Sequence, residues 1–415
     1  MEKYYINDLC RSVECKGMLI LANTENRAVI GLDSTEREAW ERVGRHEPIS
    51  KKEISNDLFE ALVELDFISQ NEYKRNRQDE IKLVSAYLHV TNRCNLHCLG
   101  CYSFDSKRNC AEDLSIEQLE CAAMRLKKAE LKSLVISGGE PFMRKDLPEL
   151  LRYCRKIGIP ETFVITNGTL EIDYGKYRGL VDEITVSVDG YSESCPPFIR
   201  DAGIFNKIVS GVEKIKKQDI PVSILPTLHK KNCGEVSKYM ELAENLDVPL
   251  NFSLLSVCDT AEFHDFLPIK EDLHTLAEAL MDTGVPIQDV SAECNLEAGL
   301  SCGAGKSIIS IDTDGSIYPC HMLHTPELKM GNILETDFKK ENLNHEAMNK
   351  VEHANVDQIK GCNSCEHRYF CSAGCRARSF YKHGDLIHQD SYCELSKHFY
   401  DMITVQLLET LEARK

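Results

Sequence analysis

The sequence predicts an α/β protein with a parallel central sheet and a smaller domain at each end, on three observations. Between Leu83 and Leu255, apolar strand-like runs alternate with amphipathic helical segments, which is the pattern of parallel strands covered by helices. The region before this combines short strand-like runs with two helical segments, and after Cys302 closely spaced cysteines become frequent. The predicted domains span residues 1–78, 79–290 and 291–415.

Composition narrows the class of protein. Of 415 residues, 42% are hydrophobic, and 49 basic against 66 acidic side chains give a net charge of −17. Nucleic acid is therefore not an expected partner, because phosphate binding needs clustered Lys and Arg. The sequence contains no apolar run of about 18 residues, so no membrane span is predicted. The charged N-terminus does not resemble a signal peptide. We expect a cytoplasmic protein, in which the 19 cysteines indicate metal binding or catalysis rather than disulfides.

The first 78 residues are expected to form a winged-helix-like α+β domain. Asp33 or Ser34 can cap the first helix. The segment 73–80 is charged and almost free of apolar residues, so it is expected to be a linker. The predicted elements are strands over 17–22 and 26–32, a helix starting near residue 33, and a helix over 51–65.

The middle of the chain is expected to supply six strands. Ser115 and Gln118 form a capping box in front of the first helix of this region. The pattern leaves open whether the strands close into a barrel or form an open sheet, but in both cases ligands bind at their carboxyl ends. The predicted strands are 83–90, 133–137, 162–166, 183–188, 222–227 and 251–255, and the predicted helices are 116–128, 147–157, 205–217 and 235–246.

A cysteine loop directly follows the first of these strands. It places Cys94, Cys98 and Cys101 at the spacing Cys-x3-Cys-x2-Cys. Three thiolates on a short loop can hold three irons of a cubane 4Fe–4S cluster, which would leave the fourth iron open to a substrate. A structural zinc loop or chance spacing is the alternative, but zinc needs a fourth ligand and His97, beside Cys98, is poorly placed to reach the same metal.

With Tyr102 directly after it, this triad resembles the signature of the radical S-adenosylmethionine (radical SAM) family. The segment 137–141, Ser-Gly-Gly-Glu-Pro, is similar to the family's Gly-Gly-Glu-Pro motif, whose backbone receives the amino group of the SAM methionine. Glycine suits this role because it lets a ligand approach the backbone. The resemblance implies a partial (β/α)6 TIM-like barrel in which one electron cleaves SAM to a hydrogen-abstracting 5′-deoxyadenosyl radical. The residues implied for catalysis and SAM binding here are Cys94, Cys98, Cys101, Tyr102, Gly138, Gly139 and Glu140.

Two later positions extend the same resemblance. Ser187 precedes Asp-Gly at a strand end, and Arg200 follows about a dozen residues later. The resemblance implies that Ser187 contacts the SAM ribose and that Arg200 pairs with the methionine carboxylate, as the guanidinium fork favours. A turn serine and a solvated arginine are the alternatives, since Asp-Gly is a strong turn dipeptide.

The C-terminal cysteines resemble the SPASM extension of radical SAM enzymes. Their order is Cys302-x12-Gly315-x4-Cys320, then Cys362-x2-Cys365-x5-Cys371-x3-Cys375, then Cys393. The resemblance implies two auxiliary 4Fe–4S clusters, and therefore three clusters in all. The first would be bound by Cys302, Cys320 and Cys375, with Cys294 as the candidate fourth ligand. The second would be bound by Cys362, Cys365, Cys371 and Cys393. A zinc ribbon using Cys362, Cys365, Cys371 and Cys375 is the alternative.

Together these resemblances imply a maturase of a ribosomally synthesised precursor peptide. The N-terminal domain resembles a peptide recognition element, in which a leader peptide adds a strand to a sheet edge, although a plain winged-helix-like scaffold would give the same pattern. An auxiliary cluster could accept the surplus electron or bind a substrate thiolate. A thioether is the favoured crosslink, with a carbon–carbon bond or another oxidation as alternatives. A one-electron donor such as flavodoxin or ferredoxin is the other expected partner.

Two further alternatives remain. The anaerobic sulfatase-maturating family shares both cluster domains, but there an aspartate acts as proton acceptor directly after the cysteine that matches Cys320. Here that position is His321, which is either a base at neutral pH or, as we favour, a hydrogen-bond partner of a cluster ligand. Outside enzymes, the alternative is a zinc-binding regulatory protein.

Overall fold

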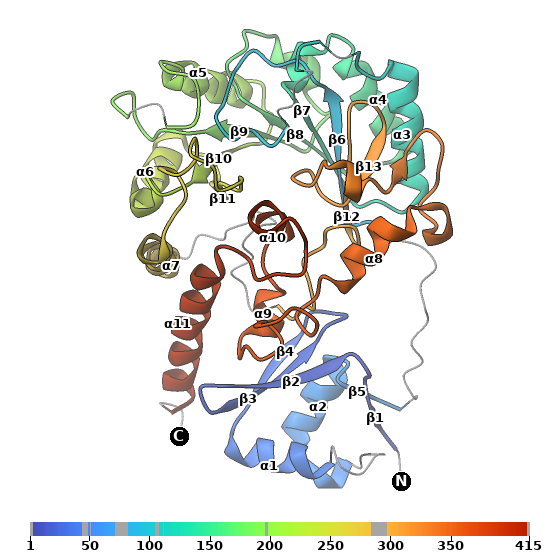
Figure 1. Cartoon of the computed structure of the whole chain (residues 1–415), viewed down its shortest axis with the longest axis vertical. Coiled ribbons are helices and arrows are strands. Elements are labelled where there is room, and N and C mark those ends of the chain that lie inside the picture. The colour runs from blue at the N-terminus through green and yellow to red at the C-terminus, as the bar shows by residue number, and fades with distance from the viewer. Residues whose placement is uncertain are drawn as a thin grey trace.

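The computed structural model describes residues 3–43, 49, 51–70, 82–103, 108–110, 112–195, 198–283 and 297–412. The predicted linker at 73–80 and Cys294 lie outside these residues. The chain folds into an upper part that holds the central sheet and a lower part that holds the N-terminal strands, with C-terminal helices between them (Figure 1).

The central sheet contains the six predicted strands, all parallel and adjacent in chain order. Their central residues, such as Leu88, Ile136 and Val164, are completely buried, because helices cover the outside of the sheet. In the described parts of the chain β11 pairs only with β10. The sheet therefore stays open, as expected of a partial barrel. The strands are β6 (Ser85–Thr91), β7 (Ser133–Gly138), β8 (Glu161–Thr166), β9 (Glu183–Val188), β10 (Val222–Leu228) and β11 (Ser253–Leu254).

The connections between these strands are helical, except that a 3-10 turn, η3 (Tyr174–Tyr177), stands where a helix would join β8 to β9. The predicted capping box is present, since Ser115 Oγ accepts from Gln118 N and Gln118 Oε1 accepts from Ser115 N. The connecting helices are α3 (Ile116–Lys128), α4 (Leu147–Ile157), α5 (Phe205–Lys216) and α6 (Val236–Leu246), and α7 (Lys270–Thr283) follows β11.

Three strands from the cysteine-rich region extend the central sheet beyond β6, which the sequence did not predict. They are β12 (Ile308–Ile311), β13 (Ser316–Tyr318) and β14 (Gly331–Asn332). β12 lies parallel to β6, and β13 and β14 follow as antiparallel strands. The C-terminal region is thus continuous with the barrel rather than tethered beside it.

The N-terminal domain is a three-stranded antiparallel sheet buried on both faces. Leu21 and Leu32 pack with the helices of the domain, whereas Val13, Cys15 and Ile20 belong to the core formed with the C-terminal helices. Opposite faces alternate along a strand, so this sheet joins its own helices to the rest of the molecule. The strands are β2 (Cys10–Cys15), β3 (Met18–Asn23) and β4 (Val29–Leu32), and the helices are α1 (Ser34–Val43) and α2 (Asn56–Glu64).

The N-terminal domain contains strands that were not predicted and a helix cap that was predicted. The strand β2 and the short pair β1 (Tyr5–Ile6) and β5 (Ile68–Ser69) were not predicted. Asp33 caps α1, because its Oδ1 accepts from Glu36 N at 2.8 Å while Glu36 Oε2 accepts from Asp33 N at 3.0 Å.

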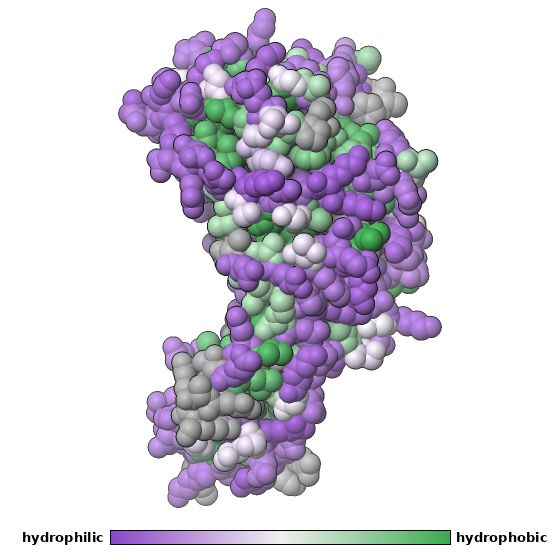
Figure 2. Space-filling view, turned by 90° about the vertical axis from the view of Figure 1, so that its left-hand side faces the viewer, coloured by the Kyte–Doolittle hydropathy of each residue, from purple (hydrophilic) through white to green (hydrophobic). Residues whose placement is uncertain are grey.

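The C-terminal helices fill the space between the sheet and the N-terminal domain (Figure 1). They are α8 (His345–His353), α9 (Arg368–Cys371), α10 (Arg376–His383) and α11 (Cys393–Glu412), and α11 packs along α7. Viewed from the left-hand side of Figure 1, where α7 and α11 lie, the molecule narrows between its upper and lower parts, and most of this face is hydrophilic (Figure 2). No helix among the described residues has the length and apolarity to cross a membrane.

Candidate active site

One cavity brings together most of the predicted site residues. It opens at the carboxyl ends of the parallel strands and encloses about 1110 Å³, including its opening to solvent. Of the predicted residues in the barrel, only Glu140 is missing from its wall. The predicted residues that line the cavity are Cys94, Cys98, Cys101, Tyr102, Gly138, Gly139, Ser187 and Arg200.

Two arginines lie against the cysteine triad. Arg200 Nη1 lies 3.5 Å from Cys98 Sγ, and Arg108 Nη2 lies 3.4 Å from Cys101 Sγ. Burial raises the pKa of the Cys98 thiol, and the charge of Arg200 opposes this shift. Three thiols that converge on one cavity beside two cations fit a cluster held by thiolates, because the cations favour the deprotonated sulfurs. Arg108 was not predicted, since it lies outside both sequence motifs.

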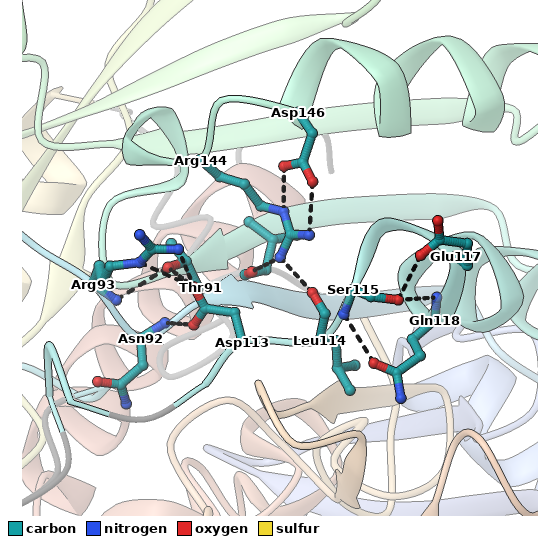
Figure 3. Close-up of polar contacts among 11 residues, drawn as sticks. Thr91, Asn92, Arg93, Asp113, Leu114, Ser115, Glu117, Gln118, Arg144 and Asp146 are labelled. Atoms are coloured by element: carbon teal, nitrogen blue, oxygen red, sulfur yellow. Dashed lines mark hydrogen bonds and ion pairs between the residues drawn. The ribbon is translucent and has the colours of Figure 1, made fainter.

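The loop that carries the triad is anchored by two networks, one partly buried around Asp113 and one buried around Arg144 (Figure 3). Asp113 accepts from Thr91 Oγ1 at 2.6 Å and from Asn92 N at 2.8 Å, and it forms an ion pair with Arg93. Arg144 donates to the carbonyls of Val90 and Leu114, both at 2.8 Å. These contacts fix the end of β6, so the cysteines enter the cavity from a rigid strand.

The two glycines of the second motif pack against this same strand end. A Cβ atom on Gly138 would lie 2.4 Å from Thr91 O, and one on Gly139 would lie 2.1 Å from Arg93 O. Gly139 N donates to Thr91 O, and Glu140 N donates to Arg93 O, both at 2.7 Å. The structure therefore adds a reason for glycine that the sequence did not suggest, which is close packing of two backbones behind the cysteine loop.

The Glu140 side chain connects loops instead of lining the cavity. It is 1% exposed; its Oε1 accepts from Thr166 Oγ1 at 2.9 Å and its Oε2 accepts from Asn167 N at 2.8 Å. Burial raises the pKa of Glu140 to about 7, although these hydrogen bonds oppose the shift. Its observed role is to hold the end of β8 beside the motif that follows β7.

Asp189 orients the segment that carries Arg200. Its Oδ2 accepts from the backbone N–H groups of Phe198 and Ile199 at 3.0 Å and from that of Arg200 at 3.3 Å. From the sequence alone, this aspartate is recognisable only as a turn residue. The signal available was its position, one residue after the end of β9, which is the strand that carries Ser187.

His321 lies in the cavity wall between two tyrosine rings. It stacks on Tyr87 at 4.1 Å between ring centroids and meets the edge of Tyr102 at 4.9 Å. Burial lowers its pKa to about 3, so the ring is neutral near pH 7. Its Nδ1 lies 3.7 Å from Cys320 Sγ, which is consistent with the favoured role as a partner of that cysteine.

The C-terminal cysteines form two groups. One small pocket is lined by Cys362, Cys365, Cys371 and Cys393. Cys302, Cys320 and Cys375 belong to a separate apolar cluster. This grouping agrees with the one that the SPASM resemblance implies and differs from the zinc ribbon, which would need Cys375 beside Cys371.

The turn between Cys371 and Cys375 explains their separation. Ser372, Ala373 and Gly374 have φ values of 50°, 68° and 64°, a left-handed path that is costly for residues other than glycine. The path directs the two thiols to different sites. Burial raises the pKa of Cys371 to about 12 and that of Cys375 to about 11, so metal binding at either site must displace a proton.

Comparison with known families identifies the class of protein. Residues 88–243 match the Radical SAM superfamily. The chain is a radical SAM enzyme, as predicted, which excludes the non-catalytic regulator. Residues 302–366 match the iron-sulfur cluster-binding SPASM domain, so the chain belongs to the radical SAM enzymes that carry this extension. Their cofactors, 4Fe–4S clusters and SAM, are those predicted.

Relatives with known names share much of the chain. The AdoMet-dependent heme synthase of Methanosarcina barkeri (strain Fusaro) is 27% identical over 73% of this chain and 94% of its own length. The mycofactocin maturase MftC of Mycolicibacterium smegmatis is 26% identical over 73% of this chain and 81% of its own.

Two solved structures share the fold. The structure of anSMEcpe with bound AdoMet has a TM-score of 0.65 at 19% identity and covers 80% of this chain and 100% of its own. Streptococcus suis SuiB bound to the precursor peptide SuiA has a TM-score of 0.59 at 15% identity, over 94% of this chain and 99% of its own.

Proposed function

We propose that this enzyme modifies a ribosomally synthesised precursor peptide, with a thioether crosslink as the favoured product. The observation that carries the proposal is the N-terminal sheet, which packs directly on the cysteine-rich C-terminal region and whose edge strand β4 pairs only with β3 among the described residues. A peptide held at this edge would therefore be bound by a domain that packs against the rest of the enzyme.

The edge of β4 is the proposed docking site for the leader peptide. Within the residues described for this domain, β4 pairs only with β3, and an unpaired edge can accept an added strand. The opposite edge, β2, is less available, because Arg11 Nη1 donates to the carbonyls of Asp8 at 2.7 Å and Cys10 at 3.0 Å.

The shape of the molecule suits a long, flexible substrate. The N-terminal sheet lies below the narrow middle of the molecule, whereas the strand ends that line the cavity lie above it (Figures 1 and 2). A substrate held at β4 must therefore extend along the molecule to reach the cavity. An extended peptide can do this, and a compact molecule cannot.

The comparisons with relatives and solved structures also favour a peptide substrate. SuiB, solved with its precursor peptide, covers 94% of this chain, against 80% for anSMEcpe. The heme synthase is covered almost completely by 73% of this chain, which leaves about a quarter of the chain without a counterpart there. The part of this enzyme that has no counterpart in the heme synthase is thus largely matched in SuiB, which was solved with a bound precursor peptide.

We assign roles to the residues of the cavity on this basis. Cys94, Cys98 and Cys101 hold the cluster that binds SAM, while Ser187 and Arg200 orient SAM. The cysteine groups of the C-terminal region hold two auxiliary clusters, and Cys294 remains the proposed fourth ligand of the first. When bound, SAM and the clusters would supply abstraction of a hydrogen atom from the C–H bond and removal of one further electron. The thiol would release a proton, so the two groups together lose two hydrogens as a C–S bond forms.

The sulfatase-maturating alternative has less support. Its proton acceptor is an aspartate at the position of His321, and the buried neutral ring of His321 is a weak base. A carbon–carbon crosslink or another oxidation of the peptide stays as an alternative product, because none of the described residues of the cavity wall selects sulfur over carbon.

The proposal is tested by expressing the enzyme with a short cysteine-containing peptide encoded beside its gene. We expect mass spectrometry to find a loss of two hydrogens per crosslink. Deleting residues 1–78 should weaken binding of the precursor at least tenfold while SAM cleavage by a chemical reductant continues. Equal affinity of the full-length and truncated enzymes for the precursor would contradict the assigned role of the N-terminal domain.

A further inference from the structure

We propose that the buried ion pair between Arg378 and Asp390 positions Cys375 and sets the reduction potential of the auxiliary cluster that Cys375 would bind. This inference rests on the auxiliary sites assigned above. Arg378 and Asp390 are 3% and 6% exposed, and neither belongs to the cysteine motifs.

Asp390 is the centre of the arrangement. Its Oδ1 accepts from Arg378 Nε at 2.7 Å and from Tyr392 N at 2.9 Å. Its Oδ2 accepts from Arg378 Nη2 at 2.5 Å and from Cys375 N at 2.7 Å. Its backbone carbonyl accepts from Cys393 N at 3.0 Å. One residue therefore holds the backbone beside a cysteine of each auxiliary group.

Arg378 connects this centre to the SAM cavity. Its guanidinium carbon lies 4.6 Å from the ring centroid of Tyr392, and its Nη1 donates to Ser256 Oγ at 3.4 Å. Tyr392 Oη donates to Leu255 O at 2.7 Å. Ser256 and Leu255 both line the cavity, so the ion pair joins the cavity wall to both cysteine groups.

The backbone at Gly374, next to Cys375, lies so close to the Asp390 carboxylate that no side chain fits between them. Gly374 has φ 64°, and a Cβ atom there would lie 2.4 Å from Asp390 Oδ2. Any larger residue at position 374 would displace the group that holds Cys375 N. The close fit indicates that the position of the carboxylate, and not only its charge, is fixed.

The charges of the pair act on the cluster with opposite signs. The charge of Arg378 favours the thiolate form of Cys375 and that of Asp390 disfavours it, and few screening waters can lie between buried groups. A cation stabilises the reduced, more negative form of a cluster and raises its potential, whereas an anion lowers it. If Arg378 and Asp390 only filled space, neutralising each of them would not shift the cluster potential in opposite directions.

The test uses the full chain with Cys94, Cys98 and Cys101 replaced by alanine, so that only auxiliary clusters contribute to the spectra. Potentials are measured by redox titration followed by electron paramagnetic resonance, and iron is counted in each sample. We expect Arg378→Gln to make the potential of one auxiliary cluster more negative and Asp390→Asn to make it more positive. Arg178→Gln, which removes an exposed ion pair with Asp219, is the matched control and should change neither potential nor iron.

Shifts of the same sign in the two variants, or no shift, would overturn the proposal. If both variants lose about four irons, Arg378→Lys decides. This variant keeps the charge, so the proposal predicts that it retains these irons and a potential close to that of the parent, and an equal loss of iron would overturn the proposal. Because the readouts involve no peptide, a failure of the proposed peptide maturation would leave these results unchanged.

Discussion

Replacing Asp189 with alanine tests how the cavity is assembled. The change removes the acceptor of three backbone N–H groups that lead into Arg200. A buried donor left without a partner costs about 1–3 kcal/mol. Ile199 is 7% exposed, so its N–H cannot easily bind water, whereas Phe198 and Arg200 are only partly buried and can recover part of the loss.

The expected cost to the folded loop is therefore about 2–3 kcal/mol, dominated by one unsatisfied donor. If that cost falls on the state in which Arg200 faces the cavity, SAM should bind about 30- to 140-fold more weakly, since 1.4 kcal/mol corresponds to a factor of ten. Asp189→Asn keeps one side-chain oxygen and should show a smaller loss.

The assay is anaerobic equilibrium dialysis of labelled SAM against the reconstituted enzyme. Asp219→Ala, at an exposed carboxylate, is the matched control and should bind SAM normally. The iron content of each variant shows whether the clusters are intact. Unchanged SAM affinity in Asp189→Ala, with full iron content, would refute the role given to Asp189.

The remaining predictions concern three other residues. Because the pKa of Glu140 is raised to about 7, the folded state binds its proton more tightly than the unfolded state; the free energy of unfolding should therefore fall as pH rises from 4.5 to 7, by up to about 3 kcal/mol. Urea unfolding should show this fall in the wild type and not in Glu140→Gln, and equal pH profiles would contradict it. Gly139→Ala should reduce iron at the triad as well as SAM binding, because its Cβ meets Arg93 O; loss of SAM binding alone would instead favour the ligand-approach explanation. Cys393→Ser should remove about four irons and leave SAM cleavage without peptide intact, and an unchanged iron count would remove Cys393 from the second auxiliary group.

The regular parts of the fold were predictable from local signals. The capping box at Ser115 and the apolar spacing of α4 are short-range features, and the structure has both where the sequence placed them. The six parallel strands followed from alternating apolar runs. The prediction that these strands close only partly into a barrel came from the family resemblance, because open and closed sheets have the same hydrophobic pattern.

The parts that were missed depend on contacts between distant segments. β12 pairs with β6 although more than 200 residues separate them, and its four residues carry little pattern of their own. Asp189 and Glu140 could be found as polar residues at strand ends, but their partners carry no sequence signal. Those of Asp189 are backbone N–H groups further along the same β9–α5 connection, and those of Glu140 lie at the end of β8. The reason for Gly139 was likewise hidden, because the obstacle is the backbone near Arg93.

The central claim is that Cys94, Cys98 and Cys101 hold the cluster at which SAM is cleaved. The most direct measurement is the formation of 5′-deoxyadenosine by Cys94→Ala, alongside its iron content. We expect no 5′-deoxyadenosine from the variant and a loss of about four irons from a total of about twelve. Wild-type rates of SAM cleavage by Cys94→Ala, or a wild-type enzyme that binds no iron after anaerobic reconstitution, would contradict the claim.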